Sequence, residues 1–210
     1  MSLSTDETAV APARRTQATR RKESDRRMLR AAARLFAERG VSGTSLADVG
    51  VAAGYSRGLP VERFGSKLGL IRALLDAMDA WFQAHLVHVL KGAKGMKAVR
   101  LRMEAHLRSV DRDATSTAAL YSIYTESLFL MPELQAHVAG TTSRWRAGLS
   151  ANLREAKRAG EIGKRVDCEA EARFLLAAMR GLVIQYLLDR SAADLARSKA
   201  ILLDRLETMT

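Results

Sequence analysis

Few residues in this chain have the types and the spacing that catalysis or metal binding needs. His85 and His88 lie three residues apart, whereas the zinc-binding HExxH motif needs a spacing of four. Cys168 is the only cysteine, which excludes an intrachain disulfide and a cysteine-based metal framework. A glycine-rich phosphate loop is absent, and a scattered Ser/His/Asp triad would leave no local pattern. The sequence therefore predicts no catalytic residue, no metal site and no cofactor, and argues against an enzyme.

A second set of residues is suited to binding a small molecule rather than to reacting with one. These residues are bulky or polar and fall on the inward faces of the helices expected in the middle of the chain. His106, Tyr121 and Tyr124 would place polar groups among apolar neighbours, and a buried polar group needs a partner that a ligand or water can supply. Ordinary core packing explains each residue singly. The predicted ligand-binding residues are Trp81, His85, Met103, His106, Tyr121, Tyr124, Phe129, Trp145, Phe174 and Met179.

The segment TSLADVGVAAGYSRGLPVERFGSK, residues 44–67, predicts two short helices joined by a tight turn. Thr44 or Ser45 can cap the first helix, with Asp48 placed after Ser45 as in a capping box. Gly54 can adopt the positive φ that ends this helix, because it has no Cβ to clash. We therefore expect a short first helix followed directly by a turn.

The same segment predicts a second helix and the start of a third. Ser56 can accept from the free amides of a helix that begins at Arg57, and Gly65 ends that helix after about two turns. Ser66 can cap a third helix that begins at Lys67. A helix, a glycine-containing turn and a second helix form the unit that many DNA-binding proteins insert into the major groove.

The rest of the chain predicts an all-α fold of about nine helices. Only 5% of the residues are aromatic and three are proline, whereas 48% are hydrophobic, enough for a packed core. Apolar residues at helical spacing extend the third helix of the segment from Lys67 to about Leu90, a span of roughly 30 Å or more. The predicted organisation is a flexible basic arm over residues 1–22, a helix-turn-helix domain over 23–67 and a helical domain over 68–210.

The two C-terminal helices carry more apolar surface than one domain needs. The run EARFLLAAMRGLVIQYLLD is apolar nearly all round, so something must cover both of its sides. The last helix, from about Ala192 to Met209, repeats leucine at helical spacing. A symmetric four-helix interface in a homodimer accounts for this surface, and a simple buried core is the alternative.

The charge of the chain favours a polyanionic partner. The formal net charge is +11, and residues 1–67 hold 13 Lys and Arg against 7 Asp and Glu. Basic excess at one end suits nucleic acid, while a merely basic protein is the alternative. No apolar stretch is long enough to span a membrane, and no secretory signal precedes the first helix, so we expect a cytoplasmic protein without a membrane partner.

Residues 27–82 contain AAARLFAERG, TSLADVG, AGYSRG, RFGSK and a long following helix in that order. This ordered set resembles the tetracycline-repressor-type (TetR) transcriptional regulators over about the N-terminal third of the chain. The resemblance implies a dimer that binds a palindromic double-stranded operator with one reading head per subunit. It also implies a C-terminal helical domain that binds a small apolar or amphipathic effector, whose binding releases the DNA. Repression follows from the resemblance, because an operator-bound dimer can block polymerase by occupancy.

The resemblance also implies roles for single residues. Thr44, Ser45 and Lys67 fall at helix N-termini, where hydroxyls, free amides and charge suit phosphate. Arg57 is the expected base-edge contact, bidentate to guanine, and Glu62 would accept from cytosine or exclude wrong placements. The expected DNA-binding residues are Thr44, Ser45, Ser56, Arg57, Gly58, Leu59, Val61, Glu62, Arg63 and Lys67.

The reading helix departs from the family pattern. Val61, Glu62 and Arg63 stand where the family often carries tyrosine and histidine, and Pro60 is tolerated only in a first turn, which predicts a helix start near Leu59. Arg63 would replace the lost phosphate contact by charge. The departures keep open the alternative of a helical ligand-binding protein that has lost DNA readout. An architectural DNA-binding protein without an effector is a further alternative, whose C-terminal domain would contain no cavity.

Overall fold

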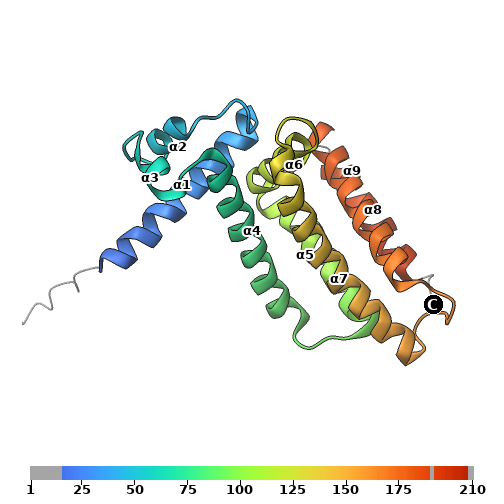
Figure 1. The fold of residues 1–210 in the computed structure, drawn as a ribbon. Helices are drawn as coiled ribbons and strands as arrows, with labels where there is room; N and C mark the ends of the chain where they lie inside the picture. Colours follow the sequence, from blue (N-terminus) through green and yellow to red (C-terminus); the bar gives the residue numbers. More distant parts are fainter. Residues whose placement is uncertain (1–15, 190–191, 208–210) are drawn as a thin grey trace, which may run out of the picture.

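The computed structural model describes residues 16–189 and 192–207, and this part of the chain contains nine α-helices, one short 3-10 helix and no strand. Figure 1 shows α1 to α3 gathered at one end of α4, and α5 to α9 forming a bundle beside it. The predicted all-α fold is confirmed. The elements are α1 (Gln17–Arg39), α2 (Leu46–Ala52), α3 (Leu59–Phe64), α4 (Lys67–Leu90), α5 (Gly95–Arg112), α6 (Ala114–Phe129), η1 (Pro132–Leu134), α7 (Gln135–Ala159), α8 (Cys168–Asp189) and α9 (Ala192–Glu207).

Helix α1 is longer than the sequence pattern indicates. It begins at Gln17, where the Thr16 hydroxyl accepts from the Thr19 amide at 3.2 Å, and it ends at Gly40 with φ 75°. The predicted arm over residues 1–22 is therefore wrong from residue 17 onward. The first turns of α1 carry no buried apolar residue, which explains why hydrophobic periodicity missed them. The arm's other basic residues, Arg14 and Arg15, lie outside the described residues.

Helix α4 connects two hydrophobic cores. The Ser66 hydroxyl accepts from the Gly69 amide at 3.0 Å, so α4 begins at the predicted cap and ends at the predicted Leu90. Its first half contributes Leu70 and Ile71 to the core of α1 and α2, whereas Phe82 lies in a separate cluster against α5 and α7. A single continuous helix thus joins the helix-turn-helix to the bundle, while the domain boundary at residue 67 stays a prediction.

Helix α6 enters the N-terminal core. Ala119 and Ile123 of α6 belong to the buried cluster that contains Phe36 of α1. The carboxylate of Glu126, one turn further along α6, accepts from the backbone amides of Val41 (2.5 Å) and Ser42 (2.7 Å) in the turn after α1. Burial works to raise the pKa of Glu126, but the bonds from Ser42 and Val41 outweigh it and lower that pKa. The bundle and the helix-turn-helix are therefore joined by apolar packing and a carboxylate.

Helices α7 and α8 pack side by side in the bundle, and α9 lies against α5 and α8. Leu175, Met179 and Val183 of α8 face the core, as do Leu195 and Leu202 of α9. The outer faces retain large apolar side chains that are exposed in the described chain: Phe174, Ile184, Leu188 and Ile201. No helix in residues 16–189 or 192–207 combines the length and hydrophobicity that a membrane span requires.

Candidate functional site

The first helix of the candidate DNA interface has the predicted cap. The Ser45 hydroxyl accepts from the Asp48 amide at 3.1 Å, and the Asp48 carboxylate accepts from the Ser45 amide at 2.9 Å. The Ser45 hydroxyl also donates to this carboxylate at 2.7 Å, and the bonds from the Ser45 amide and hydroxyl lower the pKa of Asp48. Thr44 corrects the expectation, because its side chain is only 2% exposed and its hydroxyl donates to the Gly40 carbonyl at 2.9 Å. Ser45 is exposed at this helix start, and its role in phosphate binding stays a prediction, whereas Thr44 is a buried structural residue.

The reading helix α3 begins at Leu59 rather than at Arg57. Gly54 has the expected positive φ of 80° in the turn, but Gly58 is the N-terminal cap and no side chain caps the helix. The expected Ser56 cap is wrong, because Ser56 uses its backbone carbonyl, which accepts from the Leu59 amide at 3.3 Å. Pro60 lies in the first turn, where its missing amide costs no helical bond.

Gly50 in α2 allows the two motif helices to approach closely. A Cβ atom at this position would lie 2.4 Å from the Ser56 carbonyl oxygen and 3.1 Å from Cδ of Pro60. Any larger residue would push the start of α3 away from α2. A glycine that is unfavourable for helix stability alone thus permits the packing that holds Pro60 in place.

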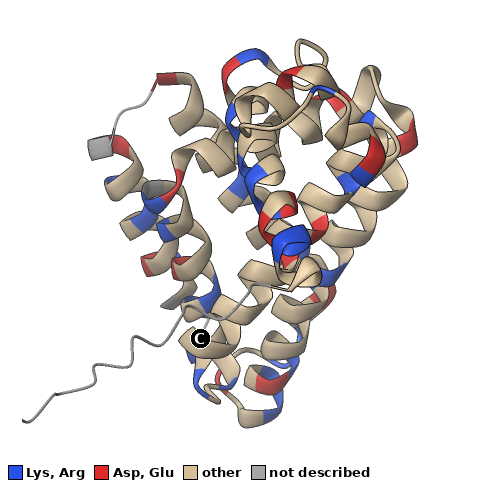
Figure 2. Cartoon of the chain, turned by 90° about the vertical axis from the view of Figure 1, so that its left-hand side faces the viewer, with Lys and Arg blue, Asp and Glu red and all other residues tan. Residues whose placement is uncertain are grey.

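The structure divides the predicted DNA-contacting residues into exposed and supporting ones. Exposed positions are Ser45, Ser56, Arg57, Gly58, Val61 and Glu62, while Leu59 and Lys67 are half-buried. Lys67 remains near the surface at the start of α4, where its Nζ donates to the Ser42 carbonyl at 3.4 Å. In Figure 2 Lys and Arg positions lie among Asp and Glu positions along the helices.

Arg63 corrects a prediction made from its charge. Its side chain is 10% exposed and forms an ion pair of 2.5 Å with Asp25 of α1. Its guanidinium also donates to the Arg21 carbonyl at 3.4 Å. A side chain held this way fixes α3 against α1 and does not extend to a phosphate.

Part of the predicted ligand-binding set meets at one internal cavity of about 20 Å³. The rings of Phe82 and Trp145 stack at 4.1 Å, and His106 meets Trp145 edge-on at 4.9 Å. His106 is 6% exposed, and burial followed by the Arg180 charge lowers its pKa to about 4, so the ring is neutral at pH 7. The cavity is lined by Phe82, Gln83, Leu86, Arg102, His106, Trp145, Leu149 and Met179.

The two predicted tyrosines lie near this cavity without lining it. Tyr121 and Tyr124 of α6 are 5.9 Å apart, and the Arg180 guanidinium lies 4.9 Å from the centre of the Tyr124 ring. Burial raises the pKa of both tyrosines. Met103, also predicted, is fully buried in the main bundle core with Tyr121.

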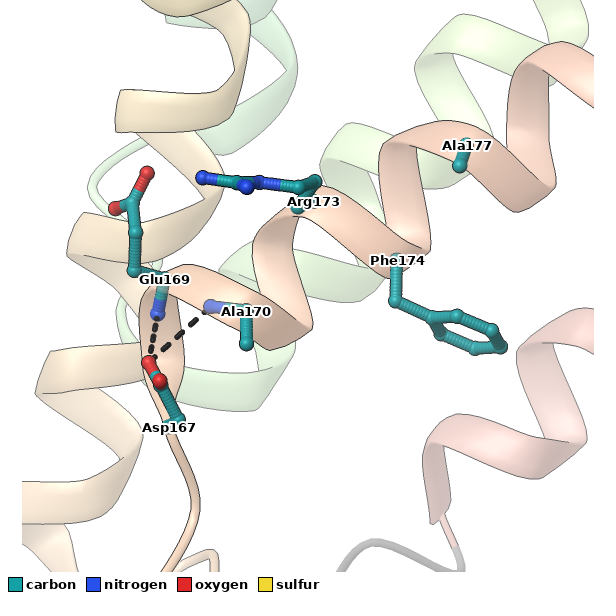
Figure 3. Close-up of a pocket in the computed structure, with 6 residues that line it drawn as sticks. All are labelled: Asp167, Glu169, Ala170, Arg173, Phe174 and Ala177. Carbon is teal, nitrogen blue, oxygen red and sulfur yellow. Dashed lines mark hydrogen bonds between the residues drawn. The ribbon is translucent and has the colours of Figure 1, made fainter.

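Three predicted ligand-binding residues are at the surface. Phe129 is 83% exposed, Phe174 is 65% exposed and Trp81 is 57% exposed with its ring stacked on His85 at 5.4 Å. Helical spacing indicated faces but did not show which of them would be covered. Phe174 borders an open hollow of about 400 Å³ at the start of α8. Figure 3 shows the residues that line it: Asp167, Glu169, Ala170, Arg173, Phe174 and Ala177. Neither Phe129, Phe174, Trp81 nor His85 lines the internal cavity.

Sequence reasoning missed a polar contact between α4 and α7. Asp79 accepts from Nε1 of Trp145 at 3.0 Å and from both Nε and Nη2 of Arg144, at 3.0 and 2.8 Å. Burial works to raise the pKa of Asp79, but these hydrogen bonds outweigh it and lower that pKa. The signal was present in LLDAMDAWF, where two acidic residues interrupt an apolar run. Trp145 thus contacts α4 through both its ring and its indole nitrogen.

In the described residues no three His, Cys, Asp or Glu side chains come together as a metal site. A helix-turn-helix with an exposed reading surface, tied by one long helix to a bundle that encloses a small cavity, defines a ligand-regulated class of DNA-binding protein. The sequence matches the family "Bacterial regulatory proteins, tetR family" over residues 28–74. It also matches "BetI-type transcriptional repressor, C-terminal" over residues 97–210, more than half of the chain. The chain belongs to the tetR family of bacterial transcriptional regulators.

Individual relatives agree with this assignment. The HTH-type transcriptional regulator TtgR of Pseudomonas putida is 26% identical over 178 residues, covering 82% of this chain and 84% of TtgR. A transcriptional regulator from Saccharomonospora viridis, solved in complex with choline, superposes with a TM-score of 0.78 at 22% identity, covering 89% of this chain and 96% of that one. FadR from Bacillus subtilis, solved in complex with stearoyl-CoA, gives a TM-score of 0.74 at 17% identity, covering 88% and 98%. At these identities the two structures support the fold alone.

Proposed function

We propose that the protein is a ligand-responsive repressor that binds a palindromic operator as a homodimer and leaves it when a small molecule enters the bundle. The main observation in support is that α4 contacts both the cavity and the helix-turn-helix core. Phe82 of α4 lines the cavity, and Leu70 and Ile71 of the same helix pack in the helix-turn-helix core. Fold neighbours with choline or stearoyl-CoA bound support a ligand site in this architecture. Operator binding would locate the protein in the cytoplasm, with the bacterial DNA.

On the DNA, the exposed residues of α3 would read the base edges. Arg57 would donate two hydrogen bonds to guanine, and Val61 offers an apolar surface for a thymine methyl group. Ser45 and Lys67, at the starts of α2 and α4, would hold phosphates and fix the register. Arg63 would act indirectly, by holding α3 on α1 through Asp25.

A second copy of the chain is the partner that fits the outer surface of α8 and α9. These two helices border a groove of about 580 Å³ whose wall includes Phe174, Leu182 and Ile201. The glycine in this wall, Gly181, has no atom within 4 Å of an added Cβ, so a facing helix has room to approach. A two-fold axis here would give a four-helix interface and two reading heads. Ile201→Asp should therefore convert a dimer into a monomer in light-scattering chromatography.

The effector would act by separating α4 from α7. A cavity of about 20 Å³ holds no more than about one water, so an organic molecule has to displace the Phe82 and Trp145 rings that stack across it. Movement of Phe82 shifts α4, and α4 carries the helix-turn-helix. Such a ligand binds the displaced arrangement better, and it weakens DNA binding by the ratio of its two affinities.

The test is selection of bound DNA from a random pool, repeated with candidate small molecules present. We expect a palindromic site that is lost with one ligand. Arg57→Ala should abolish the sequence preference at fixed salt, whereas Arg108→Ala, exposed on α5, should retain it. An architectural protein would keep its DNA with every molecule tried, and unchanged binding by Arg57→Ala would instead indicate a ligand-binding protein without base readout.

A further inference from the structure

The cavity contains polar groups that the protein itself does not satisfy. Both ring nitrogens of His106, which lines the cavity, are buried without a hydrogen-bond partner among the described residues. Each buried unpaired group of this kind costs about 1–3 kcal/mol. Because His106 is neutral, its ring offers one N–H donor and one acceptor. A bound molecule with a polar group could form hydrogen bonds with this donor and this acceptor.

Arg102 lies one turn before His106 on α5 and lines the same cavity. Its Nε donates to the Asn152 side-chain oxygen at 2.7 Å, and burial lowers its pKa against the opposing effect of the Glu155 charge. Gly148 makes room for its guanidinium, because a Cβ there would lie 2.8 Å from Nη1. Among the ion pairs of the described residues none involves Arg102, and Glu155 acts on it only through its charge, so an anion can still approach its terminal nitrogens.

The one residue of permanent charge in the lining of the cavity is Arg102, which is positive. No aspartate or glutamate is among the residues that line it. Arg180 adds a positive potential that acts on His106 and Tyr121, and its Nη2 donates to the neutral Thr142 hydroxyl at 3.0 Å. Asp79, behind Trp145, already accepts from Arg144 and from the indole. The polar side of the cavity therefore attracts an anion and repels a quaternary ammonium or other cation.

The opposite side of the cavity is apolar and flat. The stacked rings of Phe82 and Trp145 and the thioether of Met179 present surfaces suited to an aromatic ring. On these grounds we propose that the effector is an aromatic organic anion, a carboxylate or phenolate, with its oxygen on Arg102 and the His106 N–H and its ring against Phe82 and Trp145. This proposal rests on the effector role proposed above and names the chemical class of the molecule.

The experiment compares matched naphthalene probes by titration calorimetry on the full chain without DNA. The probes are 2-naphthoate, the neutral 2-naphthamide and the cation (2-naphthylmethyl)trimethylammonium, with benzoate as a smaller carboxylate. We expect 2-naphthoate to bind at least about tenfold more tightly than 2-naphthamide, because a charge-assisted bond to Arg102 adds about 1.4 kcal/mol or more. The cation should show no saturable binding.

Variants of one helix separate charge from fold. Arg102→Gln should weaken 2-naphthoate at least about tenfold and leave 2-naphthamide unchanged, and Arg102→Lys should restore part of the loss. Arg108→Gln is the matched control, because Arg108 is an exposed residue of the same helix, paired only with Glu104. Thermal melts of each variant verify the fold before titration.

Two results would overturn the proposal: no saturable binding of either carboxylate at millimolar concentration, or equal affinity for the carboxylate, the amide and the cation. Unchanged 2-naphthoate binding by Arg102→Gln would likewise remove Arg102 from the site. The failure of the wider function looks different. A chain that binds 2-naphthoate but selects no DNA sequence is not an operator-binding repressor, whereas one that selects an operator and ignores every carboxylate is a regulator with another class of effector.

Discussion

Acid should destabilise the folded protein through His106 in a narrow pH range. The pKa of His106 falls from an ordinary 6.5 to about 4 on folding, because the ring is buried and faces Arg180 of α8, Phe82 of α4 and Trp145 of α7. Between these two values the unfolded chain binds a proton that the folded chain does not. Stability is therefore fully present above pH 6.5 and is lost as the pH falls toward 4. At about 1.4 kcal/mol per pH unit, the loss from this one residue is roughly 3 kcal/mol.

The assay is urea unfolding followed by circular dichroism at one protein concentration, at pH 7, 6, 5 and 4. His106→Phe keeps an aromatic ring of similar size and removes the titrating group. Subtracting the free energies of unfolding of the two proteins therefore removes the contribution of the carboxylates, which titrate in both. Between pH 7 and pH 4 the wild type should lose roughly 3 kcal/mol of free energy of unfolding relative to the variant. His88→Gln, at an exposed histidine of α4, should show no such change. A wild-type to His106→Phe difference that is flat with pH would refute the reasoning, since it would mean that His106 titrates as it does in water.

Three further substitutions test other contacts. Glu126→Gln should lower the free energy of unfolding by about 1–3 kcal/mol, measured by urea titration, because the charged acceptor of two backbone amides in the turn after α1 is lost. Gly50→Ala should cost about 1–3 kcal/mol and weaken binding to the selected operator, since its Cβ would lie 2.4 Å from the Ser56 oxygen. Arg63→Gln should weaken binding to all DNA sequences alike in a mobility-shift assay, because the Asp25 tie that positions α3 is broken.

Each of these outcomes has a matched contrast. Gly140→Ala, in α7 with only an ordinary contact, should be neutral or stabilising by about 0.5–1 kcal/mol, so equal effects at both glycines would contradict the crowding argument. Ser122→Ala removes one neutral donor to Glu126 and should cost less than the loss of the carboxylate charge. A changed base preference in Arg63→Gln, at constant overall affinity, would show that Arg63 reads bases after all.

Local signals made most helix boundaries predictable from the sequence. Ser45 and Ser66 cap helix N-termini with their hydroxyls, and Gly40 and Gly65 have positive φ at helix ends. These residues act on neighbours in the sequence, so their effect does not depend on tertiary contacts. The start of α1 was missed because its first turns are exposed and polar, so only propensity and the Thr16 cap marked them. Pro60 fixed the start of α3 more strongly than the serine and arginine before it.

The candidate site was predictable only in part, because its decisive contacts join distant segments. The Arg63–Asp25 ion pair spans 38 residues and the Arg102–Asn152 bond spans 50, and no spacing in the sequence announces either. Helical periodicity correctly predicted that His106 faces inward, because His106 lies on the face of α5 that the fold buries. It failed for Phe129, whose face of α6 no described helix covers.

The contact between Gly50 and Pro60 has a consequence for anyone who wishes to redirect the protein to a new operator. The reading helix α3 cannot be exchanged by itself, because its first turn packs directly against the backbone of Gly50 in α2. Replacing α3 alone would remove Pro60 and leave unfilled space beside Gly50. Replacing α2 alone with a helix that has alanine at position 50 would push the native α3 outward. The smallest portable unit is therefore α2, the turn and α3 together, residues 45–65.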